Sequence, residues 1–238
     1  MRVPIDSIEP DRIESLAEQL IAGGEVEQIV LLRWWDFMRA RRNREYRAML
    51  QHGTVIPVSK SIPMAARLLH RHKPPRYMPF DFVIRLLGGL ENRSRSIYLL
   101  GGTPAALRTA EQNLRQTFPG LKLVGRYAGH YPKAREADII TAIRKANPDI
   151  LFVGPGLPGT RMWIARHRAQ LSPGIYLQSP DVFQIFAERR QRGSRKAFKR
   201  GFDFLPDLFR RPWRLFRIFV YIWFLVVLVV KRVFSRPQ

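Results

Sequence analysis

The chain has 238 residues, of which 46% are hydrophobic, so it is long enough for one large domain or one domain with an appendage. It contains no cysteine, which excludes structural disulfides, zinc–thiolate sites and thiol catalysis. Forty-one Lys and Arg residues against 19 Asp and Glu residues give a formal net charge of +22. A surface of this charge attracts polyanions, namely nucleic acid, anionic lipid or phosphate-bearing substrates, and charge alone does not choose among them.

The first third of the chain predicts alternating strands and helices. The residues after Met1 lead into a polar helical pattern and not into the apolar stretch of a secretory signal. A short strand is expected first, then a helix that carries Ile13, Leu16 and Leu20 at helical spacing and stops at Gly23-Gly24. Further along we expect strands at 28–32 and 54–58, and helices at 34–50, 61–70 and 80–87. The arginines of the 34–50 helix predict either a solvated face or a surface for phosphates and headgroups: Arg39, Arg41, Arg42, Arg44 and Arg47.

The pattern is clearest after residue 95. A strand at 96–100 ends in Gly101-Gly102, after which Thr103 is a good N-cap and Pro104 suits the first position of a helix that runs to about 117. A strand at 149–153 likewise ends in glycines, Gly154 and Gly156. The remaining strands are expected at 121–125 and 174–177, and the remaining helices at 136–146 and 163–171.

Strands and helices that alternate at this spacing predict βαβ units. The expected fold class is α/β, with a mainly parallel, Rossmann-like sheet and helices on both faces. Ligands of such sheets bind beyond the carboxyl ends of the strands, where glycine allows close backbone approach and a following helix presents N–H groups to an anion. Two glycine turns at successive strand ends therefore indicate a nucleotide site.

The C-terminal segment differs in composition from the rest. Arginines and aromatic residues are interleaved up to Arg217, and residues 218–230 are uninterrupted and apolar. As a helix these thirteen residues reach only about 20 Å, which is short of the roughly 30 Å hydrocarbon core of a bilayer. A span would need Leu215 to Phe234, an in-plane or re-entrant anchor is an alternative, and a core helix is a third. The sequence predicts an α/β domain at 1–188 and a basic, membrane-associating appendage at 189–238. The residues expected to face the membrane or an acceptor are Arg195, Lys196, Lys199, Arg200, Arg210, Arg211, Trp213, Arg214 and Arg217.

Several segments resemble motifs of one known family in their order and spacing. Residues 99–104, LLGGTP, resemble its LLGG-x-P motif, and residues 118–125, FPGLKLVG, resemble YPGLKIVG. Residues 148–158, PDILFVGPGLP, are similar to PDILLVGLGSP, and residues 201–205 and 211–215 resemble its C-terminal GLEWL and EPxRL segments. The family is that of the WecG/TagA/CpsF glycosyltransferases, which move a sugar from a nucleotide donor to a lipid-linked acceptor at the cytoplasmic membrane face. The resemblance covers most of the chain and is best over 96–217.

The resemblance implies a set of site residues and partners. It implies a nucleotide-sugar donor, with UDP as the expected nucleotide, and a polyprenyl-diphosphate-linked acceptor. The basic composition adds an anionic membrane surface as an expected partner. No metal or other cofactor is expected, since no His or carboxylate cluster has ligand spacing. Self-association is a further expectation, of undefined subunit number, and no nucleic acid is expected. The implied donor-binding residues are Gly101, Gly102, Thr103, Gly129, His130, Tyr131, Gly154, Gly156 and Gln184.

The chain departs from the family pattern at several of its motifs. The family's Pro-Asp-Gly, whose Asp is its general base, appears as Pro57-Val58-Ser59, and valine cannot accept a proton. His130 and Asp81 are candidate substitutes. The other departures are Arg33-Trp34-Trp35 for Thr-Pro-Asn, Thr160-Arg161 for Gln-Glu, Gln184 for the Asp of Phe-Asp, and Ser179-Pro180-Asp181 over the preceding Gly-Gly.

Three functions follow from these observations. The first is an active, metal-independent, inverting glycosyltransferase of cell-envelope polysaccharide synthesis. The second is a catalytically degenerate, membrane-bound binding or scaffold subunit of the same pathway, which the loss at Val58 favours. The third is a nucleic-acid-binding protein, which rests on the net charge alone and gives residues 218–230 no role.

Overall fold

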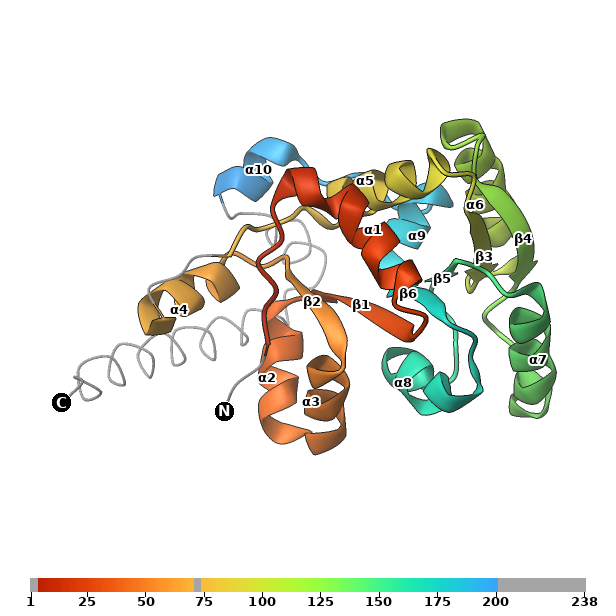
Figure 1. Ribbon diagram of the computed structural model, residues 1–238, viewed down its shortest axis with the longest axis horizontal. Coiled ribbons are helices and arrows are strands. Elements are labelled where there is room, and N and C mark those ends of the chain that lie inside the picture. The colour runs from red at the N-terminus through yellow and green to blue at the C-terminus, as the bar shows by residue number, and fades with distance from the viewer. Residues whose placement is uncertain (1–3, 71–73, 201–238) are drawn as a thin grey trace.

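The computed structural model describes residues 4–70 and 74–200, which fold around one six-stranded sheet (Figure 1). All five strand pairings are parallel, and the strand order is β2-β1-β6-β5-β3-β4. This arrangement confirms the predicted α/β fold with a Rossmann-like parallel sheet. The strands are β1 (Val26–Leu32), β2 (Gly53–Pro57), β3 (Ser96–Leu100), β4 (Lys122–Tyr127), β5 (Ile150–Val153) and β6 (Gly174–Gln178).

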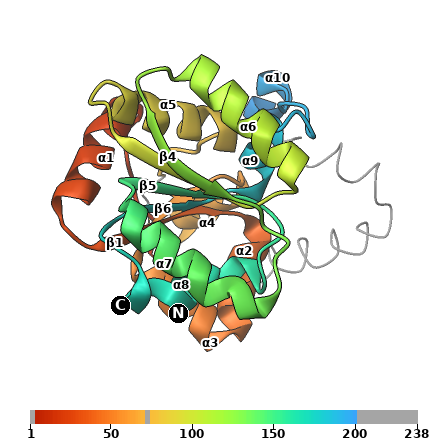
Figure 2. The ribbon, with the colours of Figure 1, turned by 90° about the vertical axis from the view of Figure 1, so that its right-hand side faces the viewer.

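Helices cover both faces of the sheet (Figure 2). The helices are α1 (Ile13–Ala22), α2 (Trp34–Arg42), α3 (Arg44–Gln51), α4 (Ser61–His70), α5 (Pro79–Glu91), α6 (Pro104–Thr117), α7 (Glu136–Ala146), α8 (Trp163–His167), α9 (Pro180–Phe186) and α10 (Arg195–Arg200). Short 3₁₀ turns lie at Pro10–Arg12, Lys133–Arg135, Thr160–Met162 and Arg168–Gln170. Helices α1, α5, α6 and α9 pack on one face, and α2, α3, α7 and α8 pack on the other.

Alternating side chains of the strands supply the two cores. Along β3, Ile97 and Leu99 lie in the cluster with α1, α5, α6 and α9, and Tyr98 and Leu100 lie in the cluster with α7 and α8. A parallel sheet that is covered on both faces needs apolar residues at nearly every strand position, which explains the continuous apolar runs of the sequence.

The strands β3 and β5 are parallel neighbours in the sheet, and the next strand along the chain is added on opposite sides of this pair. From β3 the chain passes through α6 to β4 on one side, and from β5 it passes through α8 to β6 on the other side. Such a switch point leaves a crevice beyond the carboxyl ends of the two strands, because their following loops diverge to opposite faces. Both predicted glycine turns follow these two strands.

The sequence-based prediction was wrong in three local respects. The single helix at 34–50 is two helices, because Asn43 is extended and its side-chain oxygen accepts the Tyr46 N–H at 2.7 Å, which starts a new helix. The described residues 4–9 form no strand: the Asp6 N–H donates to Val55 O at 3.0 Å, but the Val55 N–H donates to the Asp6 carboxylate at 2.6 Å, so only one backbone bond joins this segment to β2. The α-helix at 163–171 ends at His167 and continues as a 3₁₀ turn.

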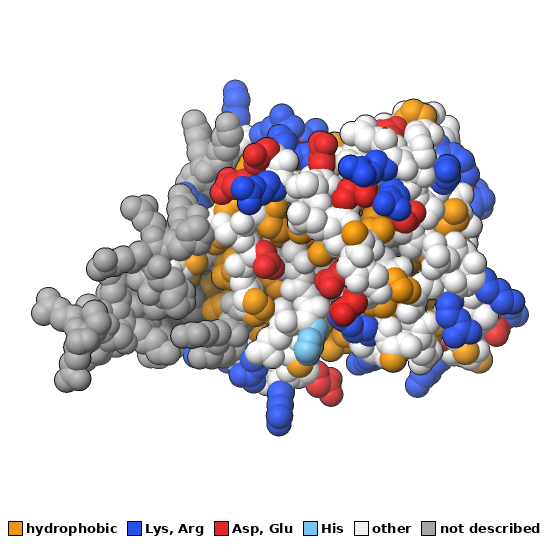
Figure 3. Space-filling view, viewed as in Figure 1, with side chains coloured by type: hydrophobic (Ala, Val, Ile, Leu, Met, Phe, Trp, Pro, Cys, Tyr) orange, Lys and Arg blue, Asp and Glu red, His pale blue; other side chains and the backbone are white. Residues whose placement is uncertain are grey.

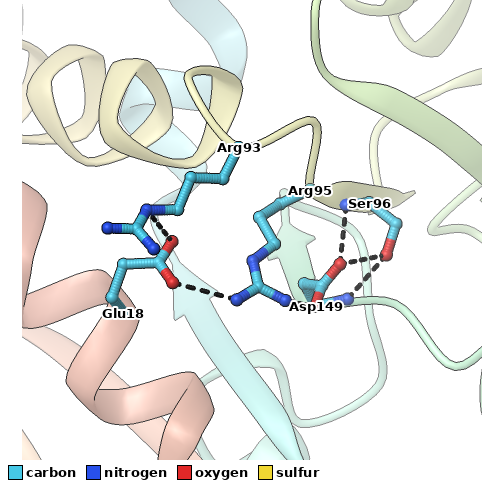
Figure 4. A network of polar contacts seen from close by, with 5 residues as sticks. All are labelled: Glu18, Arg93, Arg95, Ser96 and Asp149. Carbon is cyan, nitrogen blue, oxygen red and sulfur yellow. Dashed lines mark hydrogen bonds and ion pairs between the residues drawn. The ribbon is translucent and has the colours of Figure 1, made fainter.

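Ion pairs tie the amino-terminal edge of the sheet to α1 (Figure 4). The guanidinium of Arg95 donates to Glu18 of α1 at 2.9 Å and to Asp149, just before β5, at 3.2 Å. Asp149 also accepts the backbone N–H and the hydroxyl of Ser96, both at 2.7 Å, and Arg93 lies 3.5 Å from Glu18. These contacts fix the starts of β3 and β5 next to each other, and α1 and α5 lie side by side above them (Figure 1).

Much of the predicted appendage lies outside the described residues. Its first helix, α10, is described, and residues 201–238 are not. Within 4–70 and 74–200 no helix is long and apolar enough to cross a membrane.

Candidate functional site at the carboxyl ends of the strands

Glycines bring the loops after β3, β4 and β5 into direct contact. Gly101, Gly102 and Gly156 have φ angles of +132°, +70° and +95°, which residues with a side chain rarely adopt. A Cβ at Gly101 would lie 2.7 Å from the Cα of Gly154, and one at Gly156 would lie 2.6 Å from the imidazole of His130. The predicted glycine turns therefore meet at the switch point.

Four backbone amides of these turns donate to neighbouring carbonyl groups. The four bonds run from Gly101 N to Tyr127 O at 2.9 Å, Gly102 N to Pro155 O at 2.6 Å, Gly129 N to Gly102 O at 2.8 Å and Gly154 N to Leu100 O at 2.7 Å. We expected glycine at these positions to let a ligand approach the backbone. In the structure the glycines also allow the loops to approach one another.

An open cleft of about 540 Å³ lies beside these turns, at the end of β4 and the start of α6. Thr103 caps α6 as predicted, since its hydroxyl accepts the Ala106 N–H at 3.3 Å. The cleft wall is basic, and Arg126 is ion-paired with Glu111 of α6. The lining residues are Pro104, Leu107, Arg108, Arg126, Tyr127, Ala128, His130, Tyr131, Pro132 and Arg135. His130 and Tyr131 are thus the predicted donor-binding residues that line this cleft.

A half-buried carboxylate lies next to the cleft residue Tyr131. Glu136, at the start of α7, accepts the indole N–H of Trp163 at 2.9 Å and the hydroxyl of Tyr131 at 3.3 Å, and the Nε2 of His167 lies 3.6 Å away. Burial and the charge of Glu136 raise the pKa of Tyr131, so its hydroxyl stays protonated. The sequence analysis missed Glu136, since a single Glu in the first turn of a helix is ordinary in sequence.

Gln184 lies on α9, which follows β6, and its neighbour Phe183 packs beneath the glycine turns. A Cβ at Gly154 would lie 2.6 Å from the Phe183 ring, and one at Gly102 would lie 2.9 Å from it. Phe183 is fully buried and Gln184 is half-buried. The structure thus brings α9 against the switch point, with Gln184 one residue beyond this contact.

Val58 directly follows β2, an outer strand of the sheet, whereas His130 follows β4, the outer strand on the other side. Val58 is buried, its N–H donates to Leu32 O at 3.0 Å, and its carbonyl accepts the Arg76 guanidinium at 2.8 Å. His130 follows β4, and β2 and β4 are the first and last strands of the sheet. The imidazole of His130, however, reaches Gly156 after β5, and β5 is three strand spacings, or about 14 Å, from β2. His130 therefore does not lie beside the position of the missing base.

Asp81, the other candidate base, is in the first turn of α5 and is ion-paired. Its two carboxylate oxygens contact different guanidiniums, one of Arg192 and one of Arg195 at 3.1 Å. Because both oxygens are engaged, Asp81 is held as an anchor for the start of α10.

Two further carboxylates lie near the carboxyl ends of the strands and were not predicted to be site residues from the sequence. Asp36, in the first turn of α2, accepts the Arg33 N–H at 3.3 Å and lies within 4 Å of the guanidiniums of Arg39 and Arg161. Burial raises the pKa of Asp36 in spite of these arginines. Asp181, in the first turn of α9, is ion-paired with both Arg33 and Arg190. Residues 33 and 181 are 148 positions apart, so no local pattern pairs them.

The predicted membrane-facing cations are described only in part. Arg195 and Lys196 begin α10 and are exposed, and Lys199 and Arg200 complete that helix. The other five, Arg210, Arg211, Trp213, Arg214 and Arg217, lie outside the described residues. On the face drawn in Figure 3, Lys and Arg side chains are widely spread and alternate with Asp and Glu over α1 and α5.

Comparison with known proteins identifies the family. A Bacillus subtilis (strain 168) N-acetylglucosaminyldiphosphoundecaprenol N-acetyl-beta-D-mannosaminyltransferase is 23% identical over 176 residues, 74% of this chain and 68% of that protein. The protein of the same name from Bacillus spizizenii is 22% identical over 179 residues, and one from Staphylococcus aureus (strain NCTC 8325 / PS 47) is 24% identical over 98 residues, 41% of this chain and 38% of that protein. The sequence model of the Glycosyl transferase WecG/TagA/CpsF family matches residues 1–238. This chain therefore belongs to the WecG/TagA/CpsF family of glycosyltransferases.

Proposed function

We propose that the protein transfers a sugar from a nucleotide donor, with UDP as the nucleotide, to a polyprenyl-diphosphate-linked acceptor in cell-envelope polysaccharide synthesis. The observation that carries this proposal is the basic cleft beside the switch point of a fold whose family is that of glycosyltransferases. The named relatives act on a diphosphoundecaprenol-linked sugar, which supports a lipid-linked acceptor here.

The cleft suits a nucleoside diphosphate in size and charge. Its volume of about 540 Å³ lies within the range of small-molecule sites. The guanidiniums of Arg108, Arg126 and Arg135 would neutralise the diphosphate, a role for which their forked geometry is suited. The ring of Tyr127, which is 36% exposed and packs edge-on to Tyr131, would contact the base.

The transfer needs a proton acceptor in place of Val58. The acceptor hydroxyl oxygen forms a bond to the anomeric carbon while the bond from that carbon to the nucleoside diphosphate breaks, and the hydroxyl proton passes to a base. Of the two candidates, His130 lines the cleft and is exposed, and Asp81 is occupied by two arginines. We therefore assign the proton to His130.

Transfer from a panel of UDP-sugars to a lipid-linked acceptor in bilayers tests the proposal. We expect turnover, and we expect His130→Gln to lower kcat by about 10²–10⁴-fold because a positioned base is lost. Thr109→Gln, on the exposed side of α6, is the control and should keep wild-type kcat. Folded protein that gives no turnover across the panel would contradict the proposal.

The second candidate is a non-catalytic binding subunit of the same pathway, and the buried Val58 favours it. Val58→Asp separates the two functions. If only this variant turns over, the natural chain is a degenerate binding protein. If the natural chain already turns over, the second candidate is excluded.

Association with the cytoplasmic face of the membrane is part of the proposal. It is supported by the lipid-linked substrate in the relatives' names and by the basic, apolar-ended segment of the sequence. Vesicle flotation of the chain with and without residues 213–238 tests it. We expect the truncation to abolish flotation with anionic vesicles, and unchanged flotation would show that this segment is not the anchor.

A further inference from the structure

One carboxylate oxygen, the Oε1 of Glu136, is bonded to groups from the segments that follow β4 and β5. It accepts the hydroxyl of Tyr131, in the loop after β4, at 3.3 Å. It also accepts the indole N–H of Trp163, at the start of α8, at 2.9 Å. The Nε2 of His167, at the end of α8, lies 3.6 Å from the same oxygen. Glu136 is thus a common point of attachment for a loop and a helix from different βαβ units.

The burial of this group makes the carboxylate an effective anchor. Trp163 is fully buried, so its indole N–H needs an acceptor inside the protein. The side chains of Glu136 and His167 are 16% and 18% exposed, so water competes weakly for these contacts. A hydrogen bond to a charged acceptor is roughly twice as strong as one between neutral groups. We therefore expect the Tyr131 hydroxyl to stay bound to Glu136 in solution.

His130 lies between two residues that are each held in place. On one side, the Gly129 N–H donates to Gly102 O at 2.8 Å. On the other side, the Tyr131 N–H donates to Gly129 O at 3.1 Å, and the Tyr131 side chain reaches Glu136. His130 itself is exposed and lines the cleft. The place of its imidazole in the cleft therefore depends on how firmly Tyr131 is held.

Tyr131 also supports a second residue of the cleft wall. Its ring packs edge-on against the ring of Tyr127, with the two centroids 6.1 Å apart. Both rings line the cleft, and Tyr127 is the more exposed of the two. A displacement of Tyr131 would therefore move the Tyr127 ring together with His130.

We propose that Glu136 is a positioning residue, which fixes the loop at 128–132 so that His130 and Tyr127 face the donor. Glu136 is not one of the residues that line the cleft, and it acts through the hydroxyl of Tyr131. The role of His130 as the base rests on the proposed function, whereas the anchoring of the loop does not. Anchoring and catalysis are therefore measured separately.

Hydrogen exchange at the bonded amides of Gly129 and Tyr131, measured in the full chain, tests the anchoring without an activity assay. We expect Glu136→Ala to speed this exchange by about tenfold or more, because the Tyr131 hydroxyl loses its charged acceptor. Tyr131→Phe should have the same effect, and it leaves the acceptor of the buried indole in place. The matched control is Asp138→Ala, which removes an exposed carboxylate from the same first turn of α7 and should exchange like wild type.

Glu136→Gln separates the hydrogen bonds from the charge. An amide oxygen in the same place can accept from both Tyr131 and Trp163, because both donors are bonded to a single carboxylate oxygen. We expect exchange in this variant to stay within about threefold of wild type, since the bonds are kept in a weaker, neutral form. Exchange as fast as in Glu136→Ala would show that these hydrogen bonds do not hold the loop.

The coupling between Glu136 and His130 in sugar transfer tests the catalytic part. Glu136→Ala should lower kcat by about tenfold in the natural chain and by less than about twofold in His130→Gln, because a positioning residue has no effect once the group that it positions is gone. Asp138→Ala should leave kcat unchanged in both backgrounds. A residue with a purely structural role would lower kcat by the same factor in both.

Two results would overturn the role of Glu136. One is exchange in Glu136→Ala that equals exchange in Asp138→Ala, and the other is a loss of kcat that multiplies fully with that of His130→Gln. If the natural chain gives no turnover while Glu136→Ala speeds exchange, the proposed function fails and the anchoring of the loop stands.

Discussion

At the scale of single residues, two features mark the carboxyl ends of the strands: glycines that allow the loops to pack closely, and carboxylates that are each ion-paired with two arginines. Positions 101 and 156 require glycine because their φ angles are positive, and because atoms of other loops occupy the space that a side chain would need. Asp36, Asp81 and Asp181 are each ion-paired with two arginines, and each carboxylate offsets part of the repulsion between its two guanidiniums. The loops after β3, β4 and β5 are therefore closely packed, and paired arginines are clustered at the same ends of the strands.

The glycine contact predicts a strong position dependence of Gly→Ala substitutions. Gly101→Ala should lower the free energy of unfolding by about 2 kcal/mol or more, because its Cβ would lie 2.7 Å from the Cα of Gly154. Gly88→Ala is the control, since nothing lies within 4 Å of its Cβ position within α5. That variant should gain about 0.5–1 kcal/mol from helix propensity. Urea unfolding measures the free energy of unfolding of both variants. Equal changes in the two would show that the close contact between Gly101 and Gly154 is not what requires a glycine at position 101.

The raised pKa of Asp36 predicts a pH-dependent effect on stability. Its pKa is raised by burial, so the folded state disfavours the carboxylate form. The resulting loss of stability is present at pH values above the folded-state pKa, and it vanishes below about 3.9, where the acid is protonated in both states. Asp36→Asn keeps an acceptor for the Arg33 N–H. We expect this variant to be more stable than wild type at pH 7, with the difference shrinking toward pH 4.

Urea unfolding of this variant over a pH series checks the sign. Asp36→Ala is its control, because it loses the acceptor at the start of α2 and should lose about 1 kcal/mol at pH 7. If Asp36→Asn lowers the free energy of unfolding at pH 7 as much as Asp36→Ala does, burial is not the dominant effect on the pKa of Asp36.

At the scale of elements, sequence signals and structure agree where the signal is local. Thr103 and Pro104 start α6 as their residue types predict, and Asn147, at φ +42°, ends α7 before Pro148. Asn43 is also a local signal, a good N-cap, and it was overlooked because the basic residues on either side continue a helical pattern. Contacts such as Arg33 with Asp181 carry no such signal, because only the order of strands in the sheet brings them together.

The break at Asn43 gives the prediction at this scale. Asn43→Ala should lower the free energy of unfolding by about 1 kcal/mol, because the Tyr46 N–H loses its acceptor at 2.7 Å. Asn43→Asp keeps an acceptor oxygen and should stay close to wild type. Thermal unfolding distinguishes them, and an Ala variant as stable as the Asp variant would show that the side chain is not an effective cap.

At the scale of the whole molecule, the order of the strands decides what the site can be. The sequence predicted parallel strands with glycine-ended turns, which is enough to expect a ligand at one edge of the sheet. It could not predict that β3 and β5 are neighbours or that β2 and β4 are at opposite ends, since strand order depends on packing of the entire core. Because of this order, His130 lines the cleft and Val58 lies away from it. Arg33 and Asp181 follow β1 and β6, which lie between β2 and β5 in the sheet.

The central claim is that the cleft beside the switch point binds a nucleoside diphosphate. Calorimetric titration of UDP into wild type, Arg108→Gln and Arg115→Gln tests it most directly, because Arg108 and Arg115 both lie on α6 and only Arg108 is a lining residue. We expect Arg108→Gln to weaken UDP binding by about tenfold and Arg115→Gln to bind like wild type. No binding of UDP to folded wild type, or equal affinities in all three proteins, would contradict it.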